Sequence, residues 1–247
     1  MEPLFLAVVC GCQAGLLRDA LHEVYLPRIQ RGAASFAAKV LGIRGALVSA
    51  LAHFFENGKW GSPMQTNVEG QGLTTEDQLL ILEQTGLNLT ATRGLGASEA
   101  RVCYERAESL SYSLNRPLSL YSALMGQWLF SLHTDKLSAT IQIAKRIYSL
   151  GQEQNNSTLM VGACRAMAGT LHFMGDFEAA RRYARDGIQL WSAKGTTAQV
   201  EEVLASAVGC LFYGGLIIWH LGDVALSNAT IVNAISLAKE RPKNHAR

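Results

Sequence analysis

The chain has 247 residues, of which 49% are apolar and 17% are charged. An apolar share of this size supplies a core for one large domain or two small ones, and it excludes a disordered chain. The formal net charge is +2, from 22 basic and 20 acidic residues that are scattered along the sequence. Because affinity for nucleic acid comes mainly from a concentrated basic face, no nucleic-acid partner is expected.

The cysteines and the first residues indicate a cytoplasmic protein. The cysteine count of 5 is odd, and the close pair Cys10 and Cys12 lacks the second pair that a zinc site needs. The start of the chain is apolar like a signal peptide, but it has no basic segment, and Glu2 has the wrong sign. The apolar peak at residues 216–219 is far shorter than the roughly 20 residues that span a bilayer. We therefore expect a reducing compartment and no membrane segment.

One sequence pattern recurs along the chain. It consists of a turn with Gly or Asp, followed by a helix that has small residues at fixed offsets. In chain order the turns fall at Gly15, Gly58, Leu95, Asp135, Gly175 and Gly222. Successive copies are 37 to 47 residues apart, somewhat longer than a nominal ~34-residue helical repeat. Longer helices or longer loops between repeats account for the difference. This recurrence predicts about six helix pairs.

Helix signals in the first half of the chain agree with these turns. Thr74, followed by acidic residues, is typical of a helix cap ahead of the apolar run that begins at Leu79. After the turn at residues 95–96, Ala100, Tyr104 and Ala107 have the spacing of a helix packed against its neighbour.

The second half shows the same signals. Pro117 is tolerated in the first turn of a helix, and Asn156 and Asp176 are residues that cap helix starts. Gly151 and Gly195 follow apolar stretches, where glycines that end helices are common. The expected helices cover residues 118–132, 137–150 and 160–174. No run of alternating β-branched residues appears, so a sheet is not expected.

The clearest copy surrounds Gly175. If that glycine is the fifteenth position of a tetratricopeptide unit, the three small-residue positions of the unit fall on Ala168, Ala180 and Gly187. The copy around Gly222 has small residues at the same offsets, namely Gly215, Ser227 and Ala234. We therefore predict an all-α fold, a right-handed superhelix of antiparallel helix pairs of the tetratricopeptide-like solenoid type. A single array with truncated ends is expected over residues 1–240, followed by a polar tail at 241–247.

Several stretches are similar to the tetratricopeptide region of large bacterial predicted ATPases, which are signal-transduction proteins of adenylate-cyclase-like or winged-helix regulator type. They are residues 20–32, 91–97, 103–108 and the helix after Gly175, and the resemblance extends from about residue 3 to residue 239. In that family the array is thought to sense a partner and to restrain an ATPase module. The resemblance implies a sensor array without the ATPase, because no G-x-x-x-x-G-K-[ST] loop occurs here.

Residue patterns for catalysis are weak throughout the sequence. The six histidines share no metal-ligand spacing, and no nucleophile-elbow phrase is present. The acidic pairs Glu105/Glu108 and Glu201/Glu202 lie among partner charges, as solvated helix faces do. The sequence therefore predicts no catalytic, metal or cofactor residue and a protein that is not an enzyme.

Candidate binding residues come from the first helix of each pair, which lines the concave face of such arrays. Arg165 and His172 are seven residues apart and share a helix face, which suits an acidic peptide or a carboxylate. Met125, Phe212 and Trp219 also fit simple packing between repeats. The residues predicted to bind a partner are Arg93, Arg165, His172, Trp219 and His220.

Two functions from different classes follow. The leading hypothesis is an interaction module whose groove binds a protein or peptide segment. The alternative is a small-molecule sensor that holds a metabolite inside the superhelix; an enzyme on a helical scaffold is a weaker third. Truncated array ends would expose apolar faces, so homodimer formation through these ends is also expected.

Overall fold

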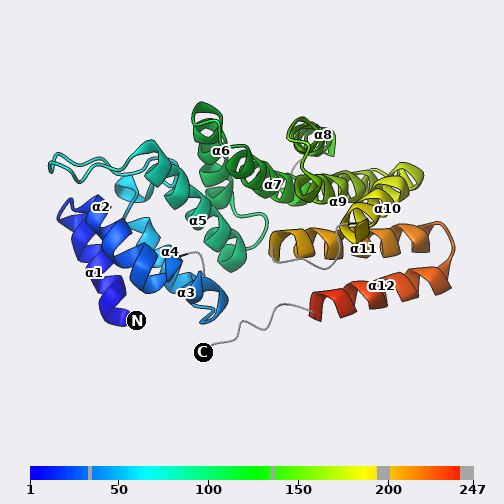
Figure 1. The fold of residues 1–247 in the computed structure, drawn as a ribbon, viewed down its shortest axis with the longest axis horizontal. Coiled ribbons are helices and arrows are strands. Elements are labelled where there is room, and N and C mark those ends of the chain that lie inside the picture. The colour runs from blue at the N-terminus through cyan, green and yellow to red at the C-terminus, as the bar shows by residue number, and fades with distance from the viewer. Residues whose placement is uncertain (33–34, 135–136, 194–200, 240–247) are drawn as a thin grey trace. The chain divides into compact units, whose positions relative to one another are not determined.

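The computed structural model shows an all-helical protein and describes residues 1–32, 35–134, 137–193 and 201–239 (Figure 1). Within these residues there is no strand, only an isolated bridge between Phe55 and Pro63. The predicted helical class is thus confirmed. The chain divides into two compact units, unit 1 over Met1–His133 and unit 2 over Thr134–Arg247. No helix in the described ranges is long and apolar enough to cross a membrane.

Unit 1 begins with short and irregular helices and ends with long ones. Its elements are α1 (Glu2–Gln13), α2 (Leu17–Asp19), the π-helix η1 (Ala20–Ile29), α3 (Phe36–Lys39), α4 (Arg44–Ala52), the 3-10 turn η3 (Glu56–Gly58), α5 (Thr75–Arg93), α6 (Ser98–Ser113) and α7 (Pro117–Thr134), whose last residue falls in unit 2. The turn predicted at Gly58 does not join two helices, because a long loop separates η3 from α5. The expected pair at this position is therefore wrong.

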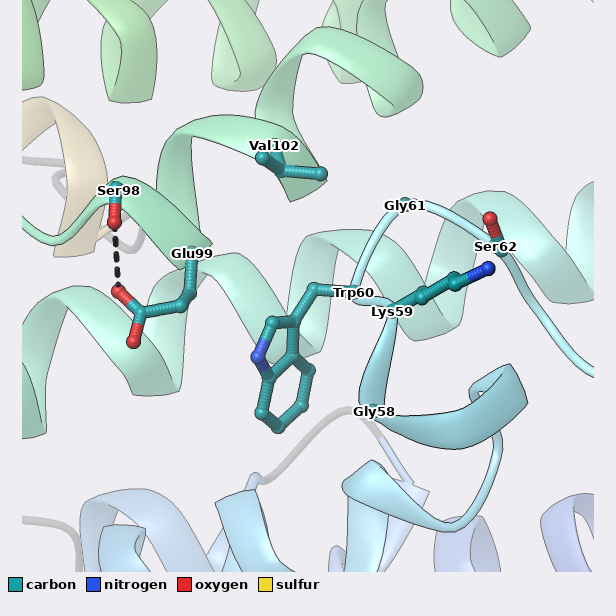
Figure 2. Close-up of a pocket in the computed structure, with 8 residues that line it drawn as sticks. All are labelled: Gly58, Lys59, Trp60, Gly61, Ser62, Ser98, Glu99 and Val102. Atoms are coloured by element: carbon teal, nitrogen blue, oxygen red, sulfur yellow. Dashed lines mark hydrogen bonds between the residues drawn. The ribbon is translucent and has the colours of Figure 1, made fainter.

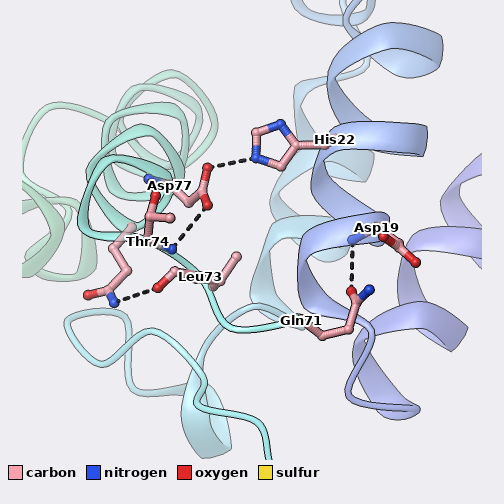
Figure 3. Close-up of polar contacts among 7 residues, drawn as sticks. Asp19, His22, Gln71, Leu73, Thr74 and Asp77 are labelled. Atoms are coloured by element: carbon pink, nitrogen blue, oxygen red, sulfur yellow. Dashed lines mark hydrogen bonds and ion pairs between the residues drawn. The ribbon is translucent and has the colours of Figure 1, made fainter. Parts of the chain in front are cut away.

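The start of α5 is fixed by the cap that the sequence predicts at Thr74 (Figure 3). The Thr74 hydroxyl accepts the backbone N–H of Asp77 at 3.1 Å, and the Asp77 carboxylate accepts the backbone N–H of Thr74 at 3.0 Å. His22 of η1 lies 2.7 Å from the same carboxylate, so the cap also ties η1 to α5. Burial opposes ionisation of Asp77, but these hydrogen bonds outweigh it and lower the pKa of the carboxyl.

Tyr104 on α6 is enclosed by two glycines of neighbouring helices. A Cβ at Gly86 on α5 would lie 2.8 Å from its ring, and a Cβ at Gly126 on α7 would lie 2.5 Å from it. The ring therefore occupies the space that side chains would otherwise take on both helices. Its hydroxyl lies 3.1 Å from the hydroxyl of Thr90, which holds the ring at its edge.

Unit 2 contains five long helices that pack in chain order. They are α8 (Leu137–Glu153), α9 (Ser157–Phe173), α10 (Phe177–Ala193), α11 (Glu201–His220) and α12 (Val224–Lys239). The pairs α9/α10 and α11/α12 are joined by tight turns at Gly175 (φ +82°) and Gly222 (φ +93°), a conformation that favours glycine. Figure 1 shows α11 and α12 side by side as a hairpin.

The predicted caps and small residues of unit 2 have the roles that the sequence indicated. Asp176 accepts the N–H of Ala179 at 3.1 Å, and Asn156 accepts that of Thr158 at 2.9 Å. A Cβ at Gly187 would lie 2.6 Å from the sulfur of Cys210, so this glycine allows α10 to approach α11 closely. The other small residues at the repeat offsets, Ala168, Ala180, Ser227 and Ala234, are all buried.

One of the two glycines predicted to end helices lies inside a helix instead. Gly151 lies inside α8 rather than after its end, so the predicted helix stop is wrong. A Cβ there would lie 2.7 Å from the sulfur of Met160, and the glycine instead provides room where α8 and α9 meet. Gly195 and the predicted tail at 241–247 fall outside the described residues.

Candidate interaction surface

The first helices of the two pairs in unit 2, α9 and α11, lie side by side and bring the predicted binding residues together. Arg165 of α9 packs over Gly209 of α11, where a Cβ would lie 2.6 Å from both its Cδ and its Nε. Two turns further along α9, His172 meets the C-terminal part of α11, with its ring centroid 5.2 Å from that of His220 and 6.2 Å from that of Tyr213. The helices therefore run in the same direction along this contact.

Aromatic rings surround the two histidines. Phe177, at the start of α10, stacks on His220 with centroids 4.5 Å apart and an interplanar angle of 9°. Trp219 lies edge-on to His220 at 4.9 Å, and Phe173 lies edge-on to His172 at 5.1 Å. The rings make a continuous cluster at the ends of α9 and α11 and the beginning of α10.

Much of this aromatic surface faces solvent. The exposed fractions are 54% for Phe173, 47% for Phe212 and 56% for Trp219. Large aromatic side chains that remain this exposed and lie together are typical of interaction sites. We call this region the α9–α11 surface and define it by Arg165, His172, Phe173, Phe212, Tyr213, Trp219 and His220.

The environment of His172 favours its neutral form. Burial and the neighbouring His220 both lower the pKa of His172, and its Nδ1 is buried without a hydrogen-bond partner. Burial raises the pKa of the nearby Tyr213, and the positive charge of Arg165 opposes this rise. Protonation of His172 places a charge in a half-buried site next to a second imidazole.

This depressed pKa gives unit 2 a pH-dependent stability. The folded state favours the neutral ring of His172. The stability that this group contributes is therefore complete above the unfolded pKa of 6.5, and it is lost as the pH falls through the lower folded pKa. We expect the melting temperature to fall between about pH 7.5 and pH 5, and to fall less in His172→Phe. Thermal unfolding followed by circular dichroism checks this. His220→Phe removes one of the two causes of the lowered His172 pKa, so its melting temperature should fall by an intermediate amount. Equal decreases in melting temperature for the wild type and both variants would show that His172 is not the titrating group.

Four of the five predicted binding residues thus lie together in unit 2, and Arg93 lies in unit 1. Arg93 forms an ion pair with Glu99, and its guanidinium carbon is 5.8 Å from the ring centroid of Trp60. Met125 is buried, in line with a packing role.

The sequence alone did not indicate Phe173, Phe177 and Tyr213 as part of this region. The seven-residue spacing of Tyr213 and His220 could have indicated the last of them.

A second candidate region is a hollow in unit 1 beside the Arg93–Glu99 pair (Figure 2). Its volume is about 380 Å³, and it is wide open to solvent. Its walls come from the last residue of η3, the loop that follows it and the first turns of α6: Gly58, Lys59, Trp60, Gly61, Ser62, Ser98, Glu99 and Val102. The carboxylate of Glu99 is already engaged by Arg93 and by the Ser98 hydroxyl, which lies 3.2 Å away. Ligand sites usually enclose most of their ligand. A hollow that is open to solvent and whose carboxylate is already paired with Arg93 is therefore a poor site for a small ligand.

The buried thiols are poorly suited to nucleophilic chemistry. Burial raises the pKa of Cys12, Cys103 and Cys164 to about 12 each, and raises that of Cys210 as well, so these groups are neutral thiols near pH 7. In the described ranges no group of three or more His, Cys, Asp or Glu side chains is arranged to hold a metal ion.

No protein-family model matches the chain, and no curated protein matches it.

Proposed function

We propose that the chain is a non-catalytic interaction module that binds a segment of another polypeptide on the α9–α11 surface. The observation that carries this proposal is the exposed aromatic cluster of Phe173, Phe212 and Trp219 beside the half-buried Arg165. Aromatic and arginine side chains supply most of the affinity at protein interfaces, because they combine apolar area with directed donors. The segment that fits carries an aromatic or large apolar side chain next to a carboxylate.

The carboxylate preference comes from the charges on the surface. Arg165 and His172 lie along one face of α9, and the guanidinium of Arg165 gives this face a positive charge that favours a carboxylate. His172 adds positive charge as the pH falls. The nearby carboxylates of Asp176 and Asp223 already accept N–H groups at the starts of α10 and α12. For a bound acidic residue, the favourable charge comes from Arg165, and from His172 once that ring is protonated.

We further propose that the helix pairs form a right-handed superhelix of the tetratricopeptide-like type. In unit 2, α11 packs against both helices of the preceding pair, and small residues occupy the close approaches, as in tetratricopeptide units. A right-handed superhelix built from such pairs places the first helices, α9 and α11, on its concave side. This placement supports a binding role for the α9–α11 surface.

The resemblance to the sensor array of bacterial signal-transduction ATPases supports a regulatory role in the cytoplasm. In this proposal the bound segment belongs to an ATPase or to a protein that controls one. The present sequence supplies the array alone, since it contains no phosphate-binding loop. The absence of a disulfide between the five cysteines is compatible with a reducing compartment.

The competing function is a small-molecule sensor, and the hollow at Trp60 is the observation that favours it. That hollow does not enclose a ligand, whereas metabolite sites bury most of their ligand. The two functions predict different binding residues. The α9–α11 surface requires Arg165 and Trp219, and the hollow requires Trp60 and Lys59.

Selection from a random peptide display library tests the proposal. We expect the immobilised chain to enrich sequences that combine an aromatic residue with Asp or Glu, and we expect Trp219→Ala to lose this enrichment. Trp60→Ala, which changes the hollow instead, serves as the matched control and should retain it. Failure of the wild-type chain to enrich any sequence class would overturn peptide binding, and loss of enrichment only in Trp60→Ala would move the site to unit 1.

A further inference from the structure

The outer face of α12 has an unusual composition for a solvent-exposed helix. Between Val224 and Ala238 this helix contains no charged residue. Its buried side, which includes Ser227 and Ala234, packs on α11. The opposite side is exposed and centres on Val232. We call this side the α12 face and define it by Ala225, Asn228, Ala229, Val232, Ile235 and Ser236, which lie within one broad stripe at helical spacing.

The equivalent helix of the preceding pair shows what a solvated face looks like in this protein. Aligning the turns at Gly175 and Gly222 places Arg181, Arg182 and Arg185 of α10 at the positions of Asn228, Ala229 and Val232 of α12. These three arginines are exposed even though α11 packs on α10. A further helix pair after α12 would therefore leave the α12 face uncovered as well.

We propose that the α12 face is the contact through which two copies of this chain associate about a two-fold axis. A surface without charge is electrostatically compatible with itself, whereas the arginine-rich face of α10 would repel its own copy. Val232 is 55% exposed and Ile235 is 50% exposed, so both lose apolar area to water when the face is covered.

The order of side chains along the α12 face suits an antiparallel pairing centred on Val232. In that register Val232 meets its own symmetry mate. Ile235 then lies opposite Ala229, a large side chain against a small one. Asn228 lies opposite Ser236, and an amide and a hydroxyl can exchange hydrogen bonds. The central residues of the stripe thus have the spacing of a two-helix seam with partners of complementary size or polarity, while Ala225 at its end lies opposite Lys239.

Light scattering coupled to gel filtration tests the association with the full chain. At about 100 µM, a concentration that populates a micromolar dimer, we expect twice the mass of one chain. Val232→Arg, which introduces the residue found at the equivalent place on α10, should give the mass of one chain with an unchanged circular dichroism spectrum. Gln189→Arg adds the same charge to the exposed side of α10 and should remain dimeric. A wild-type chain that is monomeric at this concentration would overturn the proposal.

Disulfide trapping tests the register independently of folding effects. In a Cys10→Ser background, which removes the exposed native thiol, Val232→Cys should form a linked dimer on mild oxidation because the two residues meet at the axis. Asn233→Cys, also exposed but about 100° around the helix, should remain a monomer on a non-reducing gel. Equal trapping at both positions would show random collision and would contradict the pairing.

Discussion

Replacing Gly126 with alanine is expected to destabilise unit 1 by about 2 kcal/mol relative to a Gly→Ala change at an open helical position. The new Cβ would lie 2.5 Å from two ring carbons of Tyr104. The ring has little freedom to move away, because Gly86 approaches its other edge and Thr90 holds its hydroxyl. Chemical denaturation followed by circular dichroism measures the change in free energy of unfolding.

Gly45 supplies the matched control for this experiment. It lies in α4 and is exposed, and a Cβ added there would meet no other part of the described chain within 4 Å. Alanine there should be neutral or should stabilise by up to about 1 kcal/mol, since helix propensity improves without a steric cost. Equal effects at Gly126 and Gly45 would show that Tyr104 does not fill the space between α5 and α7.

The second large effect is expected on binding. Arg165→Glu should weaken the affinity for an acidic, aromatic peptide obtained by display by about thirtyfold or more, which corresponds to about 2 kcal/mol or more. The change removes the guanidinium that we propose interacts with the peptide carboxylate, and it adds a like charge. Isothermal titration calorimetry with purified peptide measures it. Arg165→Met keeps the apolar stem over Gly209 and should also lose affinity, which separates loss of the guanidinium from loss of packing.

Arg93→Glu is the control for charge reversal in general. Arg93 belongs to unit 1, is paired with Glu99 and is not one of the residues that define the α9–α11 surface, so its replacement changes the net charge equally without altering those residues. Its peptide affinity should match the wild type. A similar loss in both variants would mean that the peptide responds to overall charge, and the surface assignment would then be wrong.

Local signals in the sequence predict much of unit 2. Asn156 and Asp176 cap helices because their short side chains reach the first free N–H groups, and Gly175 and Gly222 adopt the positive φ that the turns require. Small residues at repeat offsets become close helix contacts, as at Gly187. The caps and turns depend on neighbours within one or two turns, so they can be read without the fold, whereas the repeat spacing predicts only that Gly187 is a close contact and not which helix it meets.

Unit 1 was less predictable because its irregular elements depend on distant contacts. The turn signal at Gly58 gives no helix pair, since the following loop leads through Trp60 to the cap at Thr74. The π-helical conformation of η1 likewise has no local signature. At the candidate site, the spacing of Arg165 and His172 predicts a shared face, but the packing of Phe177 on His220 joins different helices and needs the tertiary structure.

Photo-cross-linking shows directly whether a peptide binds on the α9–α11 surface. The selected peptide, synthesised with benzoylphenylalanine at its aromatic position, is irradiated with the wild-type chain, and the linked residues are identified by mass spectrometry. We predict cross-links to Phe173, Phe212 and Trp219, which are the exposed aromatic residues of this surface. Cross-links concentrated at the Trp60 hollow or on α12, with none on α9 or α11, would contradict the account.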